Sequence, residues 1–207
     1  VTLATRTFTP EPTAAALRLG ALARALAGGG DRVRVLTSRL APAVARGAAR
    51  ADEPGSGLVE VRRAPVLRDR TGAVRGYVSY LSFDVPLIAR LLAGPRPDVV
   101  VAEPPPTTGA AVRLACALRR VPYVYYCADI VSDAAALAGV ARPVVRAVAG
   151  LESFALRGAR RVVAVSDGVA GRARDLGAAD VAVVPNGVRV PEVVAAGVPE
   201  GFPTCGG

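Results

Sequence analysis

Short runs of apolar, mostly β-branched residues alternate with longer runs rich in Ala, Leu and Arg along most of this 207-residue chain. Several short runs are apolar almost throughout, which is typical of parallel strands that are buried on both faces of a sheet. Seven strands are predicted, at residues 1–5, 32–37, 58–66, 98–102, 122–127, 161–165 and 181–184.

The longer runs carry apolar residues three and four positions apart, which is the spacing of an amphipathic helix. Five helices are predicted, at residues 14–27, 78–92, 108–119, 142–156 and 168–176. The Pro-, Ala- and Gly-rich stretch that ends at Gly57 is predicted to be a loop. Strands that alternate with helices form βαβ units, so we predict a doubly wound α/β domain with a mostly parallel, Rossmann-like sheet.

The side-chain inventory excludes several classes of chemistry. The chain has no His, which removes imidazole bases, His-ligated zinc and the Ser-His-Asp triad. All 26 basic residues are Arg, so the lysine of a Walker-type phosphate loop or of a Schiff-base enzyme is missing. Three cysteines without a C-x-x-C spacing indicate neither a disulfide framework nor a zinc site. We expect no metal and no cofactor, and a reducing cytoplasm fits the cysteines.

The net charge of +9 favours an anionic partner, unless it only reflects a solvated Arg surface produced by codon bias. The arginines are spread along the chain and only 4% of the residues are aromatic, so we expect no nucleic acid. A small anionic molecule or an anionic membrane surface fits better. No apolar run reaches the length of about 18 residues that a membrane span needs, and no signal peptide is visible.

Ligands of doubly wound sheets bind at the carboxyl ends of the strands, which makes the following turns candidate sites. After the first strand, the helix start at Thr13 could hold a phosphate, or Thr13 could be an ordinary N-cap. Glu103 could bind a sugar hydroxyl or be a solvated turn carboxylate. Asp129 could act as a hydrogen-bonding group or base, or as a cap, and would share a face with Asp133 only in a helix. Ser166 is favoured as an N-cap.

One stretch mixes arginines with aromatic side chains. It contains Arg68, Arg70, Arg75, Tyr77, Tyr80 and Phe83. The arginines could meet lipid phosphates while the rings lie at headgroup depth, which makes Arg68, Arg70, Arg75 and Tyr77 candidates for an anionic membrane surface. The favoured alternative is a solvated basic loop, followed by a helix that packs its aromatic residues inward.

Six segments, in order along the chain, resemble motifs of one enzyme family. They are FTPEPT at 8–13, VRVLTS at 33–38, PDVV at 97–100, ADI at 128–130, VVAVSDG at 162–168 and VPNGV at 184–188. The series resembles the N-terminal domain of retaining family 4 glycosyltransferases with the GT-B fold, of the actinobacterial, colanic-acid-type group.

This resemblance implies that residues 1–188 form an acceptor-binding domain and that residues 189–207 are an irregular tail. In the family, a second Rossmann-like half binds the nucleotide-sugar donor, and that half is absent from this sequence. The complete enzyme would transfer a hexose to a glycan or lipid-linked acceptor, in the cytoplasm or at the inner face of the membrane. We expect this chain alone to be inactive. The alternatives are a non-catalytic module that binds an anionic membrane or a partner, and half of a sugar-nucleotide epimerase.

The resemblance also assigns roles to single residues. The loop that contains Pro12, Thr13 and Ala14 would approach the donor phosphates and the acceptor. The family often has Gly in this loop, and the methyl group of Ala14 could block close approach of the backbone to a phosphate.

Asp129 would contact the transferred sugar or the acceptor, and it is the candidate catalytic residue. Asn186 and Gly187 would lie at the interdomain hinge. Glu103 and Ser166, from the strand ends, complete the candidate donor- and acceptor-binding residues.

Overall fold

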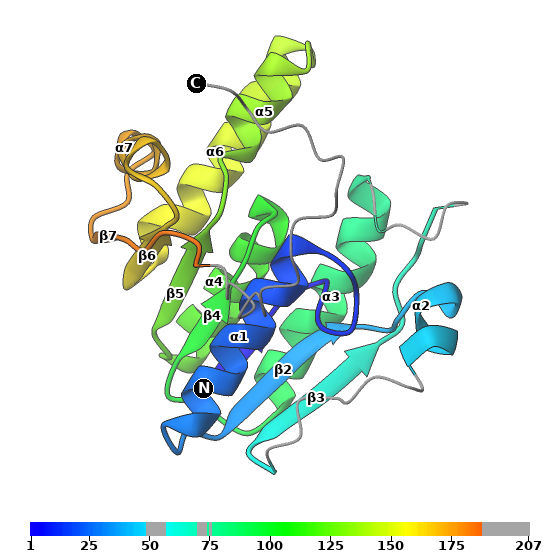
Figure 1. Cartoon of the computed structure of the whole chain (residues 1–207). Coiled ribbons are helices and arrows are strands. Elements are labelled where there is room, and N and C mark those ends of the chain that lie inside the picture. The colour runs from blue at the N-terminus through cyan, green and yellow to red at the C-terminus, as the bar shows by residue number, and fades with distance from the viewer. Residues whose placement is uncertain (49–56, 70–73, 75, 188–207) are drawn as a thin grey trace, which may run out of the picture.

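The computed structural model describes residues 1–48, 57–69, 74 and 76–187 of the chain. Its seven strands form a single sheet in the order β3-β2-β1-β4-β5-β6-β7, and all neighbouring strands are parallel (Figure 1). The strands are β1 (Thr2–Ala4), β2 (Val33–Ser38), β3 (Val59–Ala64), β4 (Val100–Ala102), β5 (Tyr123–Cys127), β6 (Arg161–Ala164) and β7 (Val181–Val183). The predicted fold class is confirmed.

Helices connect the strands. They are α1 (Ala14–Gly28), α2 (Pro42–Ala48), α3 (Tyr77–Ala93), α4 (Pro106–Arg119), α5 (Val131–Leu137), α6 (Arg142–Gly158) and α7 (Asp167–Asp175). The stretch before Gly57 was predicted to be a loop, but the structure has the helix α2 there. The helix α5 was not predicted. Both helices have seven residues, which is too short for an apolar period to become visible.

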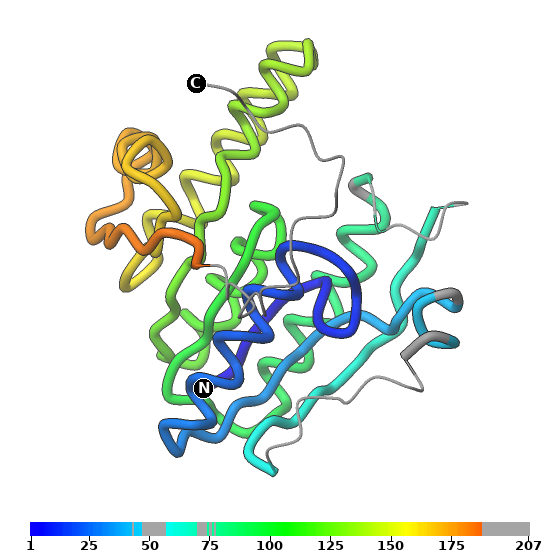
Figure 2. The backbone as a smooth tube through the Cα atoms, viewed as in Figure 1, coloured from blue at the N-terminus to red at the C-terminus, as the bar shows by residue number. Residues whose placement is uncertain are grey.

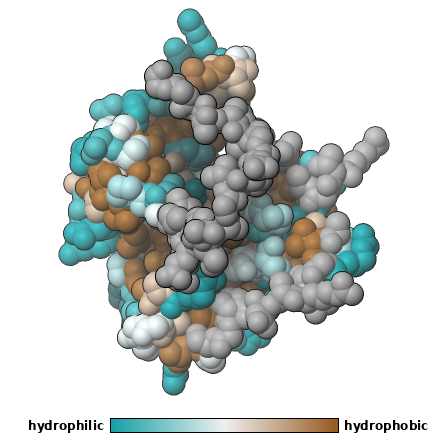
Figure 3. Space-filling model, in the orientation of Figure 1, coloured by the Kyte–Doolittle hydropathy of each residue, from teal (hydrophilic) through white to brown (hydrophobic). Residues whose placement is uncertain are grey.

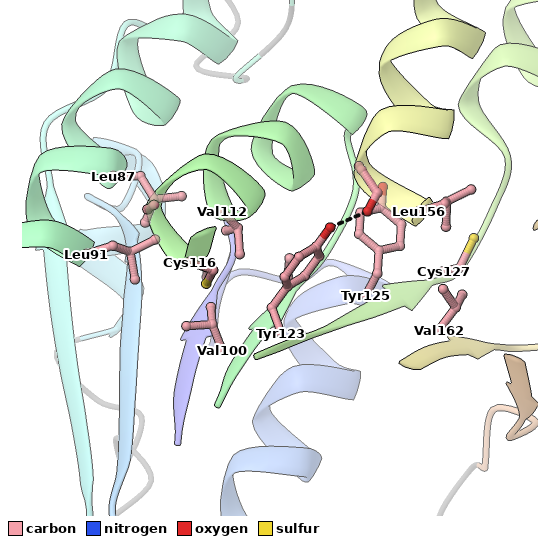
Figure 4. Packing of buried hydrophobic residues seen from close by; sticks show 14 of the residues in the cluster. Leu87, Leu91, Val100, Val112, Cys116, Tyr123, Tyr125, Cys127, Leu156 and Val162 are labelled. Carbon is pink, nitrogen blue, oxygen red and sulfur yellow. Dashed lines mark hydrogen bonds between the residues drawn. The ribbon is translucent and has the colours of Figure 1, made fainter. Parts of the chain in front are cut away.

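Two apolar clusters fix the layers of the domain. On one face of the sheet, Leu19 and Ala23 of α1 pack against strand residues that include Leu3 and Val35. On the other face, α3, α4 and α6 cover the sheet. Figure 4 shows Leu87, Leu91, Val112, Cys116 and Leu156 from these helices beside Val100, Tyr123, Tyr125 and Val162 from the strands. Successive side chains of a strand point to opposite faces, so strands between two helix layers are apolar along their length.

The direction in which the strands are added reverses beside β1. From β1 the chain moves outward to β2 and β3, then crosses back to β4 and continues to β7 (Figure 2). The helices that follow β1 and β4 therefore leave toward opposite faces, α1 to one and α4 to the other. In doubly wound sheets this switch point is where ligands bind.

The helices α5 and α6 form a hairpin that extends beyond the carboxyl edge of the sheet (Figure 1). Glu152 of α6 is only 1% exposed and caps the start of α5. Its Oε1 accepts the backbone N–H of Val131 at 2.9 Å, and its Oε2 accepts the N–H and the hydroxyl of Ser132 at 3.2 and 2.6 Å. Ile130, at the N-cap position, has no side-chain oxygen that could accept these hydrogen bonds.

We expect Glu152→Gln to lower the free energy of unfolding by about 1–3 kcal/mol. The amide offers one acceptor oxygen instead of two, so a buried N–H of α5 loses its partner. Urea unfolding measures the loss. Glu60→Gln, which removes a half-exposed carboxylate beside Arg34 and Arg62, is the matched control and should change stability by less than about 1 kcal/mol. Equal effects of the two substitutions would contradict the capping role.

Candidate functional site

The center of the site is a hydrogen bond across the switch point. Thr5 follows β1 and Glu103 follows β4, and Thr5 Oγ1 lies 2.9 Å from Glu103 Oε2. Glu103 is only 5% exposed, so the interpretation as a solvated turn carboxylate is wrong. Burial raises the pKa of Glu103, while Thr5 and the nearby Arg18 partly oppose the shift.

The Thr5 hydroxyl has a single hydrogen but two acceptors within reach. Besides Glu103, the backbone carbonyl of Thr7 lies 2.8 Å from Thr5 Oγ1. If Glu103 is protonated, its O–H can donate to Thr5, and Thr5 can donate to Thr7. Thr5 can therefore pair with Glu103 in either protonation state, as the donor to an ionised carboxylate or as the acceptor from a protonated one.

On the α1 side of Glu103, three further side chains extend the site. Arg18 Nη2 lies 3.8 Å from Glu103 Oε1, and the Arg18 guanidinium faces the ring of Tyr126 of β5 at 5.7 Å from its centroid. The Tyr126 hydroxyl donates to Asn186 Oδ1 at 2.9 Å. These contacts connect the carboxyl ends of β4, β5 and β7, and they bring the predicted residues Glu103 and Asn186 to one edge.

On the α3 and α4 side lies a second polar group that the sequence analysis missed. The Arg6 guanidinium stacks on the ring of Tyr80 at 3.8 Å, and burial lowers the pKa of Arg6. Asp84 is buried, accepts a hydrogen bond of 2.6 Å from the Thr108 hydroxyl, and has a pKa raised by burial. Within the described residues, Arg6 Nη1 and Asp84 Oδ2 are buried without a hydrogen-bond partner. Such atoms are natural contacts for a water or a ligand hydroxyl.

A groove of about 920 Å³ runs along the outer side of α1. Its lining comprises Ala14, Leu17, Arg18, Ala21, Arg24, Ala25, Asn186 and Gly187. The groove brings three predicted residues together, and its arginines give it positive charge. Its size is in the range of small-molecule sites. Thr13 caps α1 at the end of this groove by accepting the Ala16 N–H at 3.1 Å, and the neighbouring Pro12 is exposed.

Asp129 and Ser166 follow β5 and β6. Asp129 is exposed, and its charge contributes to raising the pKa of Glu103, so the two carboxyl groups share one electrostatic environment. Because α5 begins only at Val131, Asp129 does not share a helix face with Asp133, which pairs with Arg172 at 2.8 Å instead. Ser166 caps α7 by accepting the N–H of Val169 at 3.3 Å.

The candidate membrane stretch is only partly described. Arg68 contacts Glu11 at 3.4 Å and the Ser38 hydroxyl at 3.2 Å, so its largely buried side chain holds the β1–α1 loop against β2. Tyr77 is the first residue of α3, and Phe83 packs inward, as the favoured alternative predicted. Arg70 and Arg75 lie outside the described residues.

Two other kinds of site are absent from the described ranges. No group of three or more His, Cys, Asp or Glu residues there could hold a metal ion, and no helix there is long and apolar enough to cross a membrane. Cys116 and Cys127 are buried and unbridged, and burial raises their pKa values to about 11 and about 12. Cys205 lies outside the described part.

Comparison with known proteins identifies the family. A family model described as a glycosyl transferase 4-like domain matches residues 13–187. The chain belongs to this family. No curated protein sequence matches this glycosyltransferase-like chain.

Several solved structures share its fold at low sequence identity. Anabaena Alr3699/HepE in complex with UDP has 17% identity and a TM-score of 0.56, with 90% of this chain and 43% of that chain covered. Sucrose-phosphate synthase from Thermosynechococcus elongatus has 14% identity and a TM-score of 0.63, with 90% and 48% covered. Arabidopsis thaliana UGT89C1 complexed with UDP-L-rhamnose has 11% identity and a TM-score of 0.55, with 88% and 50% covered. This chain therefore spans about half the length of these proteins.

The buried Glu103 of this glycosyltransferase-like domain predicts a pH dependence of stability. A raised pKa means that the folded chain keeps a proton that the unfolded chain releases, so stability falls as the pH rises above the unfolded Glu value of about 4.3. Glu103→Gln cannot ionise, and we expect a smaller loss of melting temperature between about pH 4 and pH 8. Thermal unfolding across this range measures it.

Asp133→Asn is a control for which the opposite change of melting temperature is expected. Arg172 lowers the pKa of Asp133, so this pair stabilises the fold above the unfolded Asp value and the contribution is lost as the pH falls. The control should therefore lower the melting temperature at high pH, whereas Glu103→Gln should raise it. An unchanged pH slope in Glu103→Gln would contradict the raised pKa.

Proposed function

We propose that this chain is the acceptor-side domain of a retaining family 4 glycosyltransferase. The complete enzyme transfers a hexose from a nucleoside diphosphate sugar to a glycan or lipid-linked acceptor. The observation that carries the proposal is the convergence of Thr5, Glu103 and Arg18 at the switch point, beside a groove of about 920 Å³. Family membership supports the same conclusion.

The groove along α1 suits the diphosphate part of a donor. Arg18 and Arg24 supply positive charge there, and Pro12, Thr13 and Ala14 lie at or beside its end. Structures with the same fold contain UDP or UDP-L-rhamnose, which supports a uridine diphosphate donor. Because this chain spans about half of those proteins, we assign most of the donor site to a second half.

The carboxyl groups at the strand ends suit the sugar hydroxyls. The enclosed Glu103 can exchange hydrogen bonds with a hydroxyl through its second oxygen, while Asp129 reaches solvent at the end of β5. An acceptor hydroxyl must lose its proton during transfer, and a carboxylate within hydrogen-bond reach can take it. We assign this contact to Asp129, and we place Ser166, Asn186 and Gly187 around it. A lipid-linked acceptor would bring the enzyme to the inner face of the membrane.

The test is sugar transfer by the complete native gene product with a panel of nucleotide sugars. We expect Asp129→Asn to lower kcat by about 100-fold or more with little change in the donor KM. Asp133→Asn, four residues along the chain, is the control and should keep the original kcat. Equal kcat values for the two variants would remove Asp129 from the chemistry. Absence of transfer from any donor would overturn the proposed function.

The isolated chain provides a second test. If the donor is held mainly by another half, the 207-residue chain should release no nucleotide from any nucleotide sugar under the conditions in which the complete enzyme does. Turnover by the chain alone would contradict the assignment as an acceptor-side domain.

A further inference from the structure

The tip of the α5–α6 hairpin exposes apolar side chains far from the core. Leu137, the last residue of α5, is 91% exposed, and Val140 and Val144 next to it are also exposed. In Figure 3, the tip at the top of the molecule shows hydrophobic surface beside hydrophilic surface. Single exposed apolar residues are common on proteins, but a projecting tip that gathers three of them offers an apolar contact surface.

The charge of the tip indicates which partner fits. Arg142 and Arg146 are exposed and lie one turn apart in α6, so they share a helix face. The sequence contains no acidic residue between Asp133 and Glu152. Asp133 pairs with Arg172, and Glu152 is buried under α5. The tip therefore combines an apolar end with unopposed positive charge.

We propose that this tip docks on an anionic lipid bilayer. Leu137, Val140 and Val144 enter the boundary between headgroups and acyl chains, and Arg142 and Arg146 pair with lipid phosphates. The surface is distinct from the stretch around Arg68, whose side chain is held inside the molecule by Glu11 and Ser38.

Docking through the tip also sets an orientation. The hairpin projects on the side of the sheet where the strands end, so the carboxyl edge turns toward the bilayer (Figure 1). A lipid-linked acceptor would then reach the switch point from the membrane surface. Only this last consequence rests on the proposed function, because docking itself requires no sugar transfer.

The absence of Trp from the chain allows a clean optical test. Leu137→Trp places a single indole at the tip, and Leu118→Trp places one on α4 at a site that is 73% exposed and far from the tip. We expect vesicles of equal parts phosphatidylcholine and phosphatidylglycerol to shift the emission of Leu137→Trp to the blue and to leave Leu118→Trp unchanged. Equal shifts at both positions, or no shift at Leu137→Trp, would overturn docking through the tip.

Co-sedimentation of the unmodified chain with the same vesicles gives an independent measurement. The double variant Arg142→Ser with Arg146→Ser should bind about tenfold more weakly or worse, and vesicles of phosphatidylcholine alone should bind the unmodified chain poorly. All these positions are exposed, and circular dichroism checks that each variant is folded. Binding that is unchanged in the double variant and equal on both kinds of vesicle contradicts the proposal. A blue shift that grows with protein concentration without vesicles would identify a second copy of the chain as the partner instead.

Discussion

An all-parallel sheet whose strand order reverses beside β1 determines where this molecule can do chemistry. Parallel strands all end at the same edge, and the reversal sends α1 and α4 to opposite faces. Thr5 and Glu103, 98 positions apart in the chain, become neighbours only because β1 and β4 pair. Arg18 of α1, Tyr126 of β5 and Asn186, which follows β7, are then arranged around this contact.

The carboxyl edge of the sheet holds several ionisable groups whose charged forms are disfavoured by burial. Glu103 and Asp84 have raised pKa values and Arg6 has a lowered one, so all three are shifted toward their neutral forms. The two apolar clusters, not this edge, hold the sheet and helices together. Groups whose burial opposes their charge, and which contribute little to the core, are typical of binding sites. The groove along α1 adjoins this edge through Arg18, which lines the groove and lies 3.8 Å from Glu103.

The sequence predicted what is encoded locally. The strands were visible because burial on both faces makes them apolar throughout, and Thr13 and Ser166 were visible as caps because capping involves residues three positions apart. The burial of Glu103 was not visible, because Thr5 and Arg18 that surround it are distant in sequence. Asp84 was missed for the same reason, since within α3 nothing marks it as a partner of Thr108.

The hairpin and the site are mechanically connected through Glu152. This carboxylate lies on α6 and accepts the backbone N–H groups of Val131 and Ser132, two and three residues after Asp129. The Cys127 thiol donates to the Asp129 carbonyl at 3.4 Å, which ties the same segment back to β5. The short connection between the sheet and α5 is therefore fixed at both ends. If the tip rests on a bilayer, Asp129 is held at a set height above the surface instead of moving with a loose loop, and an acceptor anchored in that bilayer would meet it at a fixed depth.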